Sequence, residues 1–279
     1  MKAIGIIGCG AIGIQVAKAI DEGRINNTAI AFLFDADKSA IKGLAAKLTA
    51  KNHTACFSDF TDLISSPEFK KSNLVLECAS QDAVRLFARR LLESGKDMII
   101  MSVGALTDNA LLLDLIDLSV RNGTSLVLPT GAIAGIDAIR SAREGLESVM
   151  LITTKTPKAL EGAPFFKKNT IRLDAINKKT TIFNGTAAEA VLNFPANVNV
   201  ASILALAGLG MQKTIVRIVV DPKIHYNQHE IIAEGKFGKL NIKLKNNQAK
   251  GNPKTSFLAI LSAIETVRAA SNRSLRIGT

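Results

Sequence analysis

The chain has 279 residues, which exceeds the usual size of one domain and predicts two domains or one domain with a large insertion. Hydrophobic residues make up 47% and charged residues 21%, a balance that excludes intrinsic disorder and is typical of a globular α/β protein. Lys and Arg total 35 against 24 Asp and Glu, but they are dispersed and only 5% of residues are aromatic. We therefore expect no nucleic-acid partner, and an anionic cofactor and substrate instead.

The apolar stretches and the cysteines exclude further classes of protein. Residues 98–106 and 198–211 are too short to span a membrane, and residues 1–5 lead directly into a strand without the pattern of a signal peptide. We predict a cytoplasmic protein with no membrane partner. Cys9, Cys56 and Cys78 are too few and too scattered for a disulfide framework or a paired-cysteine metal site, so we expect reduced, mostly buried thiols and no resident metal.

The first 130 residues alternate short apolar runs with segments of helical spacing. The predicted strands cover residues 2–7, 29–34, 73–78, 97–101 and 125–128, and the predicted helices cover residues 12–20, 39–50, 82–93 and 109–120. Strands this uniformly apolar are best buried on both faces of a parallel sheet, with the helices as right-handed crossovers. This half is therefore predicted to be an α/β domain with a Rossmann-type parallel sheet.

The rhythm changes after Pro129 and predicts a second, mixed α+β domain. Its predicted strands cover residues 149–154, 170–173, 180–183, 215–220, 229–234 and 239–244; its predicted helices start at the capping box of Thr186 and Glu189 and at Asn199. A last helix at 255–270 has one apolar face and is expected to return to the first domain. The predicted domains are residues 1–130, completed by 252–279, and residues 131–251.

A GxGxxG segment at residues 8–13 lies between the first strand and the first helix, where a dinucleotide-binding loop belongs. The first glycine makes the turn, the second lets the backbone approach a pyrophosphate, and the third allows close helix packing. Asp35 ends the second strand, where its carboxylate can accept both ribose hydroxyls of NAD. The predicted cofactor-binding residues of this half are Gly8, Gly10, Ala11, Ile12, Gly13 and Asp35.

Asp35 also bears on the choice of cofactor. Its carboxylate repels the 2′-phosphate of NADP, which favours NAD, but the nearby Lys38 can partly neutralise that phosphate, so use of NADP stays open.

Proton transfer near neutral pH points to histidine, and the chain has three. His53 is expected at the surface of the first half, and His225 in a solvated turn. His229 starts an apolar strand and is the candidate to face a cleft, with a purely structural histidine as the alternative. Chemistry is therefore expected at His229.

Seven motifs run in order across nearly the whole chain. They are GIIGCGAIG (5–13), ECAS (77–80), MSVGAL (101–106), GAIAGID (131–137), FPANVNVA (194–201), NQHEI (227–231) and NPKTS (252–256). With them the chain resembles the L-aspartate dehydrogenases. The resemblance implies a Rossmann domain, a second domain that supplies substrate contacts and a homodimer interface, and NAD(P)-dependent oxidation of L-aspartate.

The resemblance also implies site residues in the second half. It implies that His229 is the catalytic residue and that Ala132 and Asn199 contact the cofactor, with Asn197 as the alternative to Asn199. Capping of the following helix is a competing role for either asparagine. Gly131 and Gly135 could simply relieve the backbone at a bend. Gln228 departs from the apolar residue expected beside the histidine, and the residues that bind the substrate carboxylates are not assigned, with Lys155 and Arg140 as unplaced candidates.

The mechanism implied by this resemblance starts with removal of a proton from the substrate ammonium by His229, which allows hydride transfer and leaves iminoaspartate. Hydrolysis would give oxaloacetate and ammonia, or iminoaspartate could pass to another enzyme, such as one that makes quinolinate for NAD synthesis. Three alternatives stay open: a homoserine dehydrogenase-like enzyme, a dihydrodipicolinate reductase-like enzyme and a non-catalytic NAD-sensing protein. The chain is short for the first of these and lacks the paired-histidine motif of the second.

Overall fold

The computed structural model describes residues 1–49, 54–195, 199–249 and 252–272. Within them the chain forms two compact units. Unit 1 contains residues 1–129 together with the described residues from 260 onward, and unit 2 contains the described residues between 130 and 259. His53 and Asn197 lie outside the described residues.

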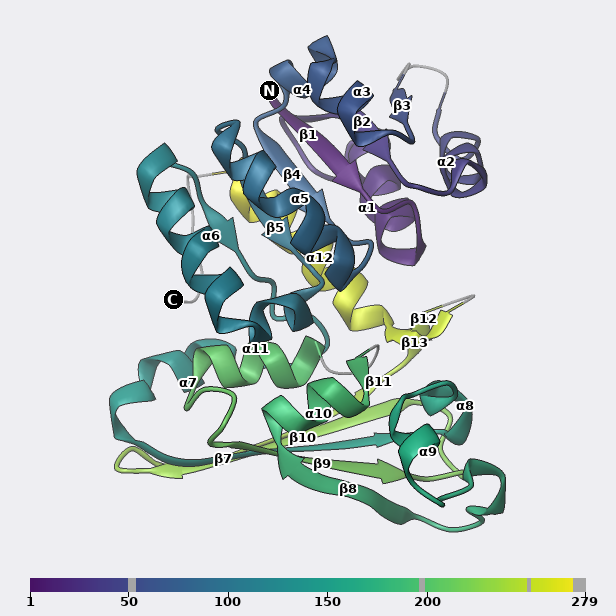
Figure 1. Ribbon diagram of the computed structural model, residues 1–279, viewed down its shortest axis with the longest axis vertical. Coiled ribbons are helices and arrows are strands. Elements are labelled where there is room, and N and C mark those ends of the chain that lie inside the picture. Colours follow the sequence, from purple (N-terminus) through teal and green to yellow (C-terminus); the bar gives the residue numbers. More distant parts are fainter. Residues whose placement is uncertain (50–53, 196–198, 250–251, 273–279) are drawn as a thin grey trace. The chain divides into compact units, whose positions relative to one another are not determined.

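Unit 1 is built on a six-stranded, all-parallel sheet in the order β3-β2-β1-β4-β5-β6 (Figure 1). This is the strand order of the dinucleotide-binding fold, so the predicted Rossmann-type sheet is confirmed. The strands are β1 (Lys2–Ile7), β2 (Thr28–Phe34), β3 (Ala55–Phe57), β4 (Leu74–Glu77), β5 (Asp97–Ile100) and β6 (Leu126–Val127). The connecting helices are α1 (Ala11–Asp21), α2 (Lys38–Ala45), α3 (Phe60–Ser65), α4 (Pro67–Lys71), α5 (Gln81–Glu93), the 3-10 helix η1 (Val103–Thr107) and α6 (Asn109–Asn122).

Local signals in the sequence set the ends of these helices. The side chain of Asp59 accepts hydrogen bonds from the first backbone N–H groups of α3, and Ser66 does the same for α4, which carries Pro67 in its first turn. Gly123 stops α6 in the left-handed conformation with φ of 60°. The elements α3, α4 and β3 were not predicted, because each is too short to show a clear periodicity of apolar residues in the sequence.

The C-terminal helix α12 (Phe257–Ser271) belongs to unit 1 from Ile260 onward, which confirms the predicted return. It buries Ile260, Ala263, Ile264 and Val267 on one face. The helix begins two residues later than predicted, because residues 252–256 form β13 (Asn252–Ser256), which pairs with β12 (Gln248–Ala249).

Unit 2 has a five-stranded mixed sheet in the order β11-β10-β7-β9-β8. Only the β7–β9 pair is parallel. The strands are β7 (Leu146–Lys155), β8 (Thr180–Thr186), β9 (Thr214–Val220), β10 (Asn227–Gly235) and β11 (Gly238–Asn246). Helices α7 (Ile136–Ser141), α10 (Ala187–Asn193) and α11 (Asn199–Ala207) lie against one face of this sheet (Figure 1). The predicted mixed α+β architecture of this half is therefore confirmed.

The strand predicted at residues 170–173 is wrong. Residues 170–172 have no regular structure, and Leu173 begins the 3-10 helix η3 (Leu173–Ala175). Ile171 is 37% exposed, and the side chain of Arg172 forms an ion pair with Asp174. The segment alternates apolar and polar residues as a strand does, but it does not pair with any strand of the described sheet. Three short helices complete unit 2: α8 (Pro157–Leu160), α9 (Phe165–Lys168) and the 3-10 helix η2 (Arg143–Gly145).

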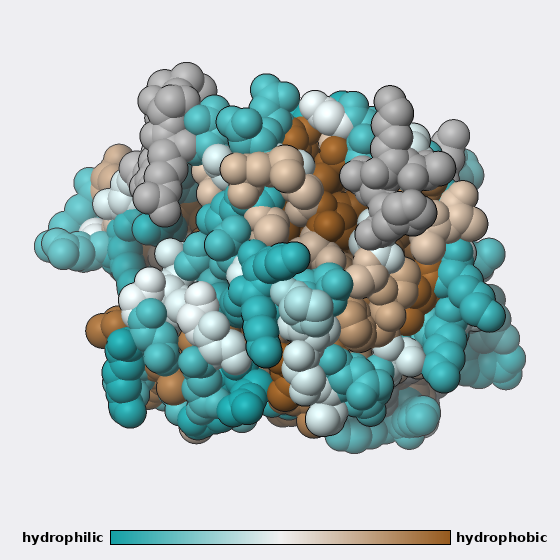
Figure 2. Space-filling model, turned by 90° about the horizontal axis from the view of Figure 1, so that it is seen from above, coloured by the Kyte–Doolittle hydropathy of each residue, from teal (hydrophilic) through white to brown (hydrophobic). Residues whose placement is uncertain are grey.

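Hydrophilic side chains cover much of the face seen in Figure 2, with hydrophobic side chains visible between them. None of the helices in the described part of the chain is long and apolar enough to cross a membrane.

Candidate functional site

The three glycines of the loop between β1 and α1 have different surroundings. Gly8 has φ of +107°, which a residue with a side chain rarely adopts. A Cβ atom at Gly13 would lie 1.9 Å from the carbonyl oxygen of Gly8, so only glycine lets α1 pack this close to the loop. A Cβ atom at Gly10 would have no neighbour within 4 Å among the described residues. The protein interior therefore does not require glycine at position 10, and the open space there suits a ligand.

The start of α1 suits an anionic ligand. Gly10 is the N-cap and provides no side-chain hydrogen bond, and the first turn, which contains Ala11 and Ile12, has no acidic residue. The amide groups of this turn and the positive end of the helix dipole therefore lie beside the open space at Gly10. This loop fits the pyrophosphate of a dinucleotide.

Asp35, just beyond the end of β2, is held beside the same loop. Its Oδ2 atom accepts a hydrogen bond from the backbone N–H of Cys9 at 2.8 Å, and its Oδ1 atom accepts one from the N–H of Asp37 at 3.0 Å. Lys38 is exposed at the start of α2. The carboxylate is thus fixed at the end of the second strand, where a dinucleotide places its adenosine ribose.

A buried carboxylate that the sequence analysis did not single out orders the neighbouring loops. Glu77 is 1% exposed at the end of β4 and accepts hydrogen bonds from the N–H groups of Ala79, Ser80 and Ser102 and from the Ser102 hydroxyl, at 2.8–3.0 Å. Burial raises the pKa of Glu77, while these four donors oppose that rise. Glu77 therefore ties the loops after β4 and β5 together. In the sequence, Glu77 stands out only as the first residue of the ECAS motif.

The three thiols are free, but their surroundings differ. Burial is the main cause that raises the pKa of Cys9 to about 12, and it also raises that of Cys78, whose Sγ contacts the carbonyl oxygen of Gly8 at 3.3 Å. Cys56 is exposed, so the expectation of mostly buried thiols does not hold for it. The two less exposed thiols act as packing groups around the glycine loop.

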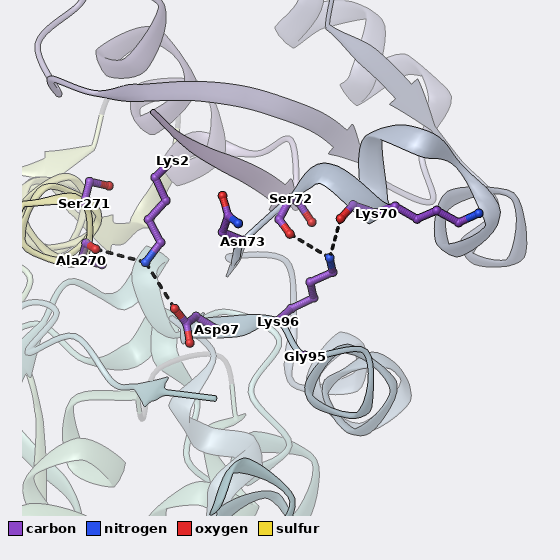
Figure 3. Close-up of a pocket in the computed structure, with 9 residues that line it drawn as sticks. All are labelled: Lys2, Lys70, Ser72, Asn73, Gly95, Lys96, Asp97, Ala270 and Ser271. Carbon is purple, nitrogen blue, oxygen red and sulfur yellow. Dashed lines mark hydrogen bonds and ion pairs between the residues drawn. The ribbon is translucent and has the colours of Figure 1, made fainter. Parts of the chain in front are cut away.

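A cavity of about 680 Å³ opens at the opposite edge of the parallel sheet, at the amino ends of β1 and β5 (Figure 3). The ammonium group of Lys2 contacts Asp97 Oδ2 at 3.2 Å and the carbonyl oxygen of Ala270 at 3.1 Å. That of Lys96 donates to the carbonyl oxygens at the end of α4 and just beyond it. These lysines cap helix C-termini, and the Lys2 contacts fasten α12 to the sheet. This cavity is remote from the glycine loop along the strands.

In unit 2, His229 is 2% exposed on β10 and its Nδ1 atom lies 3.1 Å from the hydroxyl oxygen of Thr153 on β7. Burial, followed by the nearby charge of Lys155, lowers the pKa of His229 from 6.5 to about 3. The imidazole is therefore neutral at physiological pH. If Nδ1 carries the hydrogen and donates it to Thr153, Nε2 is left as the basic atom.

In the five-stranded sheet of unit 2, the strand register places several polar side chains at one end of the face that the helices cover. Leu151, Ile231 and Ile242 form one apolar row across β7, β10 and β11, and Val149, Ala233 and Leu240 form the next. In the other direction the row changes to Thr153, His229 and Leu244, and the end row contains Asn227 beside Asn246. Continuing the β7–β10 register by one residue places Lys155 opposite Asn227. Across β7, β10 and β11, polar residues thus replace apolar ones toward this end of the face.

The other predicted residues of the second half lie in different places within unit 2. Ala132 is buried, and its carbonyl oxygen accepts a hydrogen bond from the side chain of Asn246 at 2.7 Å, which brings the 131–135 bend to the polar end of the sheet. Asn199 is exposed as the first residue of α11. Gly131 and Gly135 both have positive φ, so backbone relief at the bend accounts for them. His225 is exposed, as predicted.

Each unit thus holds a separate group of predicted residues. Unit 1 brings together Gly8, Gly10, Ala11, Ile12, Gly13 and Asp35 around one loop, and unit 2 contains Ala132, Asn199 and His229. Within the described ranges no group of three His, Cys, Asp or Glu side chains is arranged to hold a metal ion. Thr153, Asn227 and the burial of Lys155 are features of the polar end that sequence patterns did not reveal.

Comparison with known proteins gives matches along both halves. Residues 8–129 match the family model described as homoserine dehydrogenase, NAD binding domain, and residues 137–270 match the one described as aspartate dehydrogenase, C-terminal. The chain is 43% identical to the L-aspartate dehydrogenase of Nitrosopumilus maritimus over 279 residues, which is 100% of both chains. It is 45% identical to that of Methanosarcina barkeri over 269 residues, 96% of each.

A solved structure shares the fold. The crystal structure of aspartate dehydrogenase from Thermotoga maritima aligns with a TM-score of 0.75 and 24% identity, covering 99% of this chain and 100% of the other.

Proposed function

Because the chain belongs to the L-aspartate dehydrogenase family, we propose that it oxidises L-aspartate with NAD(P) and water to oxaloacetate, ammonia and the reduced cofactor. The matches to family members along the whole chain confirm the family that the sequence motifs predicted, and residues 8–129 match an NAD-binding domain. The observation that carries the proposal is the state of His229. It is a buried imidazole on β10 whose Nδ1 atom lies 3.1 Å from the Thr153 hydroxyl, an arrangement that fixes the ring and leaves Nε2 as the atom that can receive a proton.

His229 is proposed as the catalytic base. Its Nε2 atom takes a proton from the substrate ammonium, which frees the nitrogen lone pair to assist loss of the Cα hydrogen. The Thr153 hydroxyl, 3.1 Å from Nδ1, orients the ring by accepting the Nδ1 hydrogen. The cofactor, when bound, supplies the acceptor for the hydride. After oxidation the same imidazole is available to activate water for hydrolysis of the imine.

The proposed cofactor contacts divide between the units. In unit 1, Gly8, Gly10, Gly13 and the amide groups of Ala11 and Ile12 would hold the pyrophosphate, supported by the open space at Gly10. Asp35 would accept the ribose hydroxyls and favour NAD over NADP.

Two residues of unit 2 remain proposed cofactor contacts. They are Ala132, at the bend fixed by Asn246, and Asn199, at the start of α11.

An absorbance assay at 340 nm tests the activity directly. L-aspartate, D-aspartate, L-glutamate, L-alanine and L-homoserine are each offered with NAD and with NADP, and we expect reduction with L-aspartate. In addition, His229→Ala should lower kcat by orders of magnitude, on the order of 10²–10⁴-fold, while NADH binding survives. Reduction only with homoserine would assign a different substrate, and NADH binding without reduction by any amino acid would indicate a sensor.

The assembly and location of the protein are proposed from its sequence and family. We propose a cytoplasmic homodimer, and light scattering coupled to size-exclusion chromatography measures its mass. A single peak at the mass of one chain at micromolar concentration would rule the dimer out. Delivery of iminoaspartate to an enzyme of NAD synthesis is likewise a proposal, and coupled turnover with purified quinolinate-forming enzyme would test it.

A further inference from the structure

Asn227 has a buried polar atom that the fold does not use. Its side chain is 0% exposed, its Nδ2 atom donates to Ser256 Oγ at 3.2 Å, and its Oδ1 atom has no hydrogen-bond partner among the described residues. A buried acceptor without a partner costs about 1–3 kcal/mol. Turning the amide over would leave the nitrogen without a partner instead of the oxygen. A leucine, which branches at the same carbon, would leave no oxygen unpaired, and the hydrogen bond to Ser256 uses only the nitrogen of the amide, so the contacts of the fold do not explain the oxygen.

The position of this atom indicates a ligand. Asn227 and His229 are two residues apart on β10, so their side chains point to the same face of the sheet. Asn227 occupies the end row, beyond the pair of His229 and Thr153. Lys155, which is 4% exposed, is on the same face of β7 as Thr153, and its charge acts on His229. The unused oxygen therefore lies in one polar cluster with the proposed base and a buried cation.

We propose that Asn227 and Lys155 bind the amino-acid substrate, with Asn227 Oδ1 accepting a hydrogen bond from its α-amino group and the Lys155 ammonium pairing with a carboxylate. This inference rests on the function proposed above. The chemistry of the cluster matches that of the substrate: a carbonyl oxygen accepts from an amine, an ammonium group attracts a carboxylate, and the neutral imidazole takes the proton. Asn227 would thereby hold the amino group where His229 can deprotonate it, and Lys155 would select acidic substrates.

Thr214 offers a matched control. Its hydroxyl is the other buried side-chain oxygen without a partner in the described part of the chain, and it lies on the same face of the same sheet. It pairs with Val149, four residues along β7 from Thr153, which corresponds to about 13 Å. Thr214→Val therefore removes the same kind of orphaned group away from the cluster.

The experiment measures binding without turnover. Wild-type enzyme saturated with NADH, which prevents oxidation, is titrated with L-aspartate and with succinate, which has both carboxylates but no amino group. We expect Asn227→Leu to weaken binding of L-aspartate by about 10- to 100-fold and to leave succinate within about twofold. Lys155→Met should weaken both ligands, and Thr214→Val neither. Thermal unfolding of Asn227→Leu should occur at or above the wild-type temperature.

Several outcomes would overturn the inference. Wild-type affinity of Asn227→Leu for L-aspartate would do so, as would equal weakening of both ligands, because that marks general damage. Asn227→Ala, which cannot overpack the site, replaces the leucine variant if the latter does not fold, and the same expectations apply to it. If wild-type enzyme reduces NAD with L-aspartate but the variants bind normally, this inference alone fails. If wild-type enzyme neither binds nor oxidises L-aspartate, the proposed function fails first.

Discussion

Replacing His229 by glutamine should make the protein more resistant to acid. The pKa of His229 lies at about 3 in the folded protein and near 6.5 in an unfolded chain. Above pH 6.5 neither state holds the proton, so the shift has no effect on stability. Below pH 6.5 the unfolded chain takes up a proton that the folded protein refuses, and the free energy of unfolding falls. The loss is about 1.4 kcal/mol for each pH unit and reaches about 5 kcal/mol near pH 3.

Urea unfolding at pH 7.5, 6.5, 5.5 and 4.5 measures this effect. Glutamine does not titrate, so His229→Gln lacks the loss, while the carboxylates titrate in the same way in both proteins. The difference between the two free energies should therefore move in favour of the variant by about 2–3 kcal/mol between pH 7.5 and 4.5. His225→Gln serves as the matched control, because His225 is exposed and its replacement should not change the pH dependence.

Parallel curves for wild type and His229→Gln would refute the reasoning, because they would mean that the imidazole protonates as easily in the folded protein as in water. The base proposed here would then be largely charged near pH 6, and its neutral state could not be attributed to burial. A shift of the opposite sign would indicate an anionic neighbour in place of Lys155.

Three further predictions concern the cofactor loop and the base. Gly10→Ala should keep the wild-type melting temperature but weaken NADH binding by about tenfold or more, whereas Gly13→Ala should lower the free energy of unfolding by about 1–3 kcal/mol, because only the Cβ atom at position 13 would meet the backbone. Calorimetry measures the stability of both variants and fluorescence titration measures their NADH binding. Equal melting temperatures of the two variants would contradict the prediction. Asp35→Ser should raise the ratio of kcat/KM for NADP to that for NAD by at least about tenfold, and an unchanged ratio would assign selectivity elsewhere. Thr153→Val should lower kcat by about 10- to 100-fold with the KM for NAD unchanged, Thr153→Ser should restore it, and full activity of the valine variant would remove Thr153 from the mechanism.

The first half of the fold could be predicted because its signals are local. A strand such as β4, which is mostly apolar, and the GxGxxG turn before α1 can each be predicted from a few consecutive residues. The 170–173 segment shows the limit of the same approach. Its alternation resembles that of β8, but a strand requires a neighbour with free backbone groups, and alternation in sequence does not supply one.

The candidate site also contains residues that local sequence signals predict and residues that only the folded sheet brings together. The glycine loop and Asp35 could be found because the chain presents them in one short stretch, and His229 because histidines are few and the resemblance marked it. Thr153 is 76 residues from His229, and nothing near it in the sequence distinguishes it from other threonines of β7. Its role depends on the β7–β10 register, which only the folded sheet fixes.

That register also explains why the polar end of the unit 2 sheet can carry chemistry without loss of the fold. On β7 and β10 the rows that contain Leu151 and Val149 are apolar and buried, so they contribute hydrophobic stabilisation to the sheet. The end rows bury Thr153, His229, Lys155 and Asn227 at a cost, since polar groups lose water there. Part of this cost falls on Asn227 Oδ1, which has no hydrogen-bond partner among the described residues. A polar substrate that pairs with these groups would recover part of it, which makes binding and deprotonation consequences of the same arrangement.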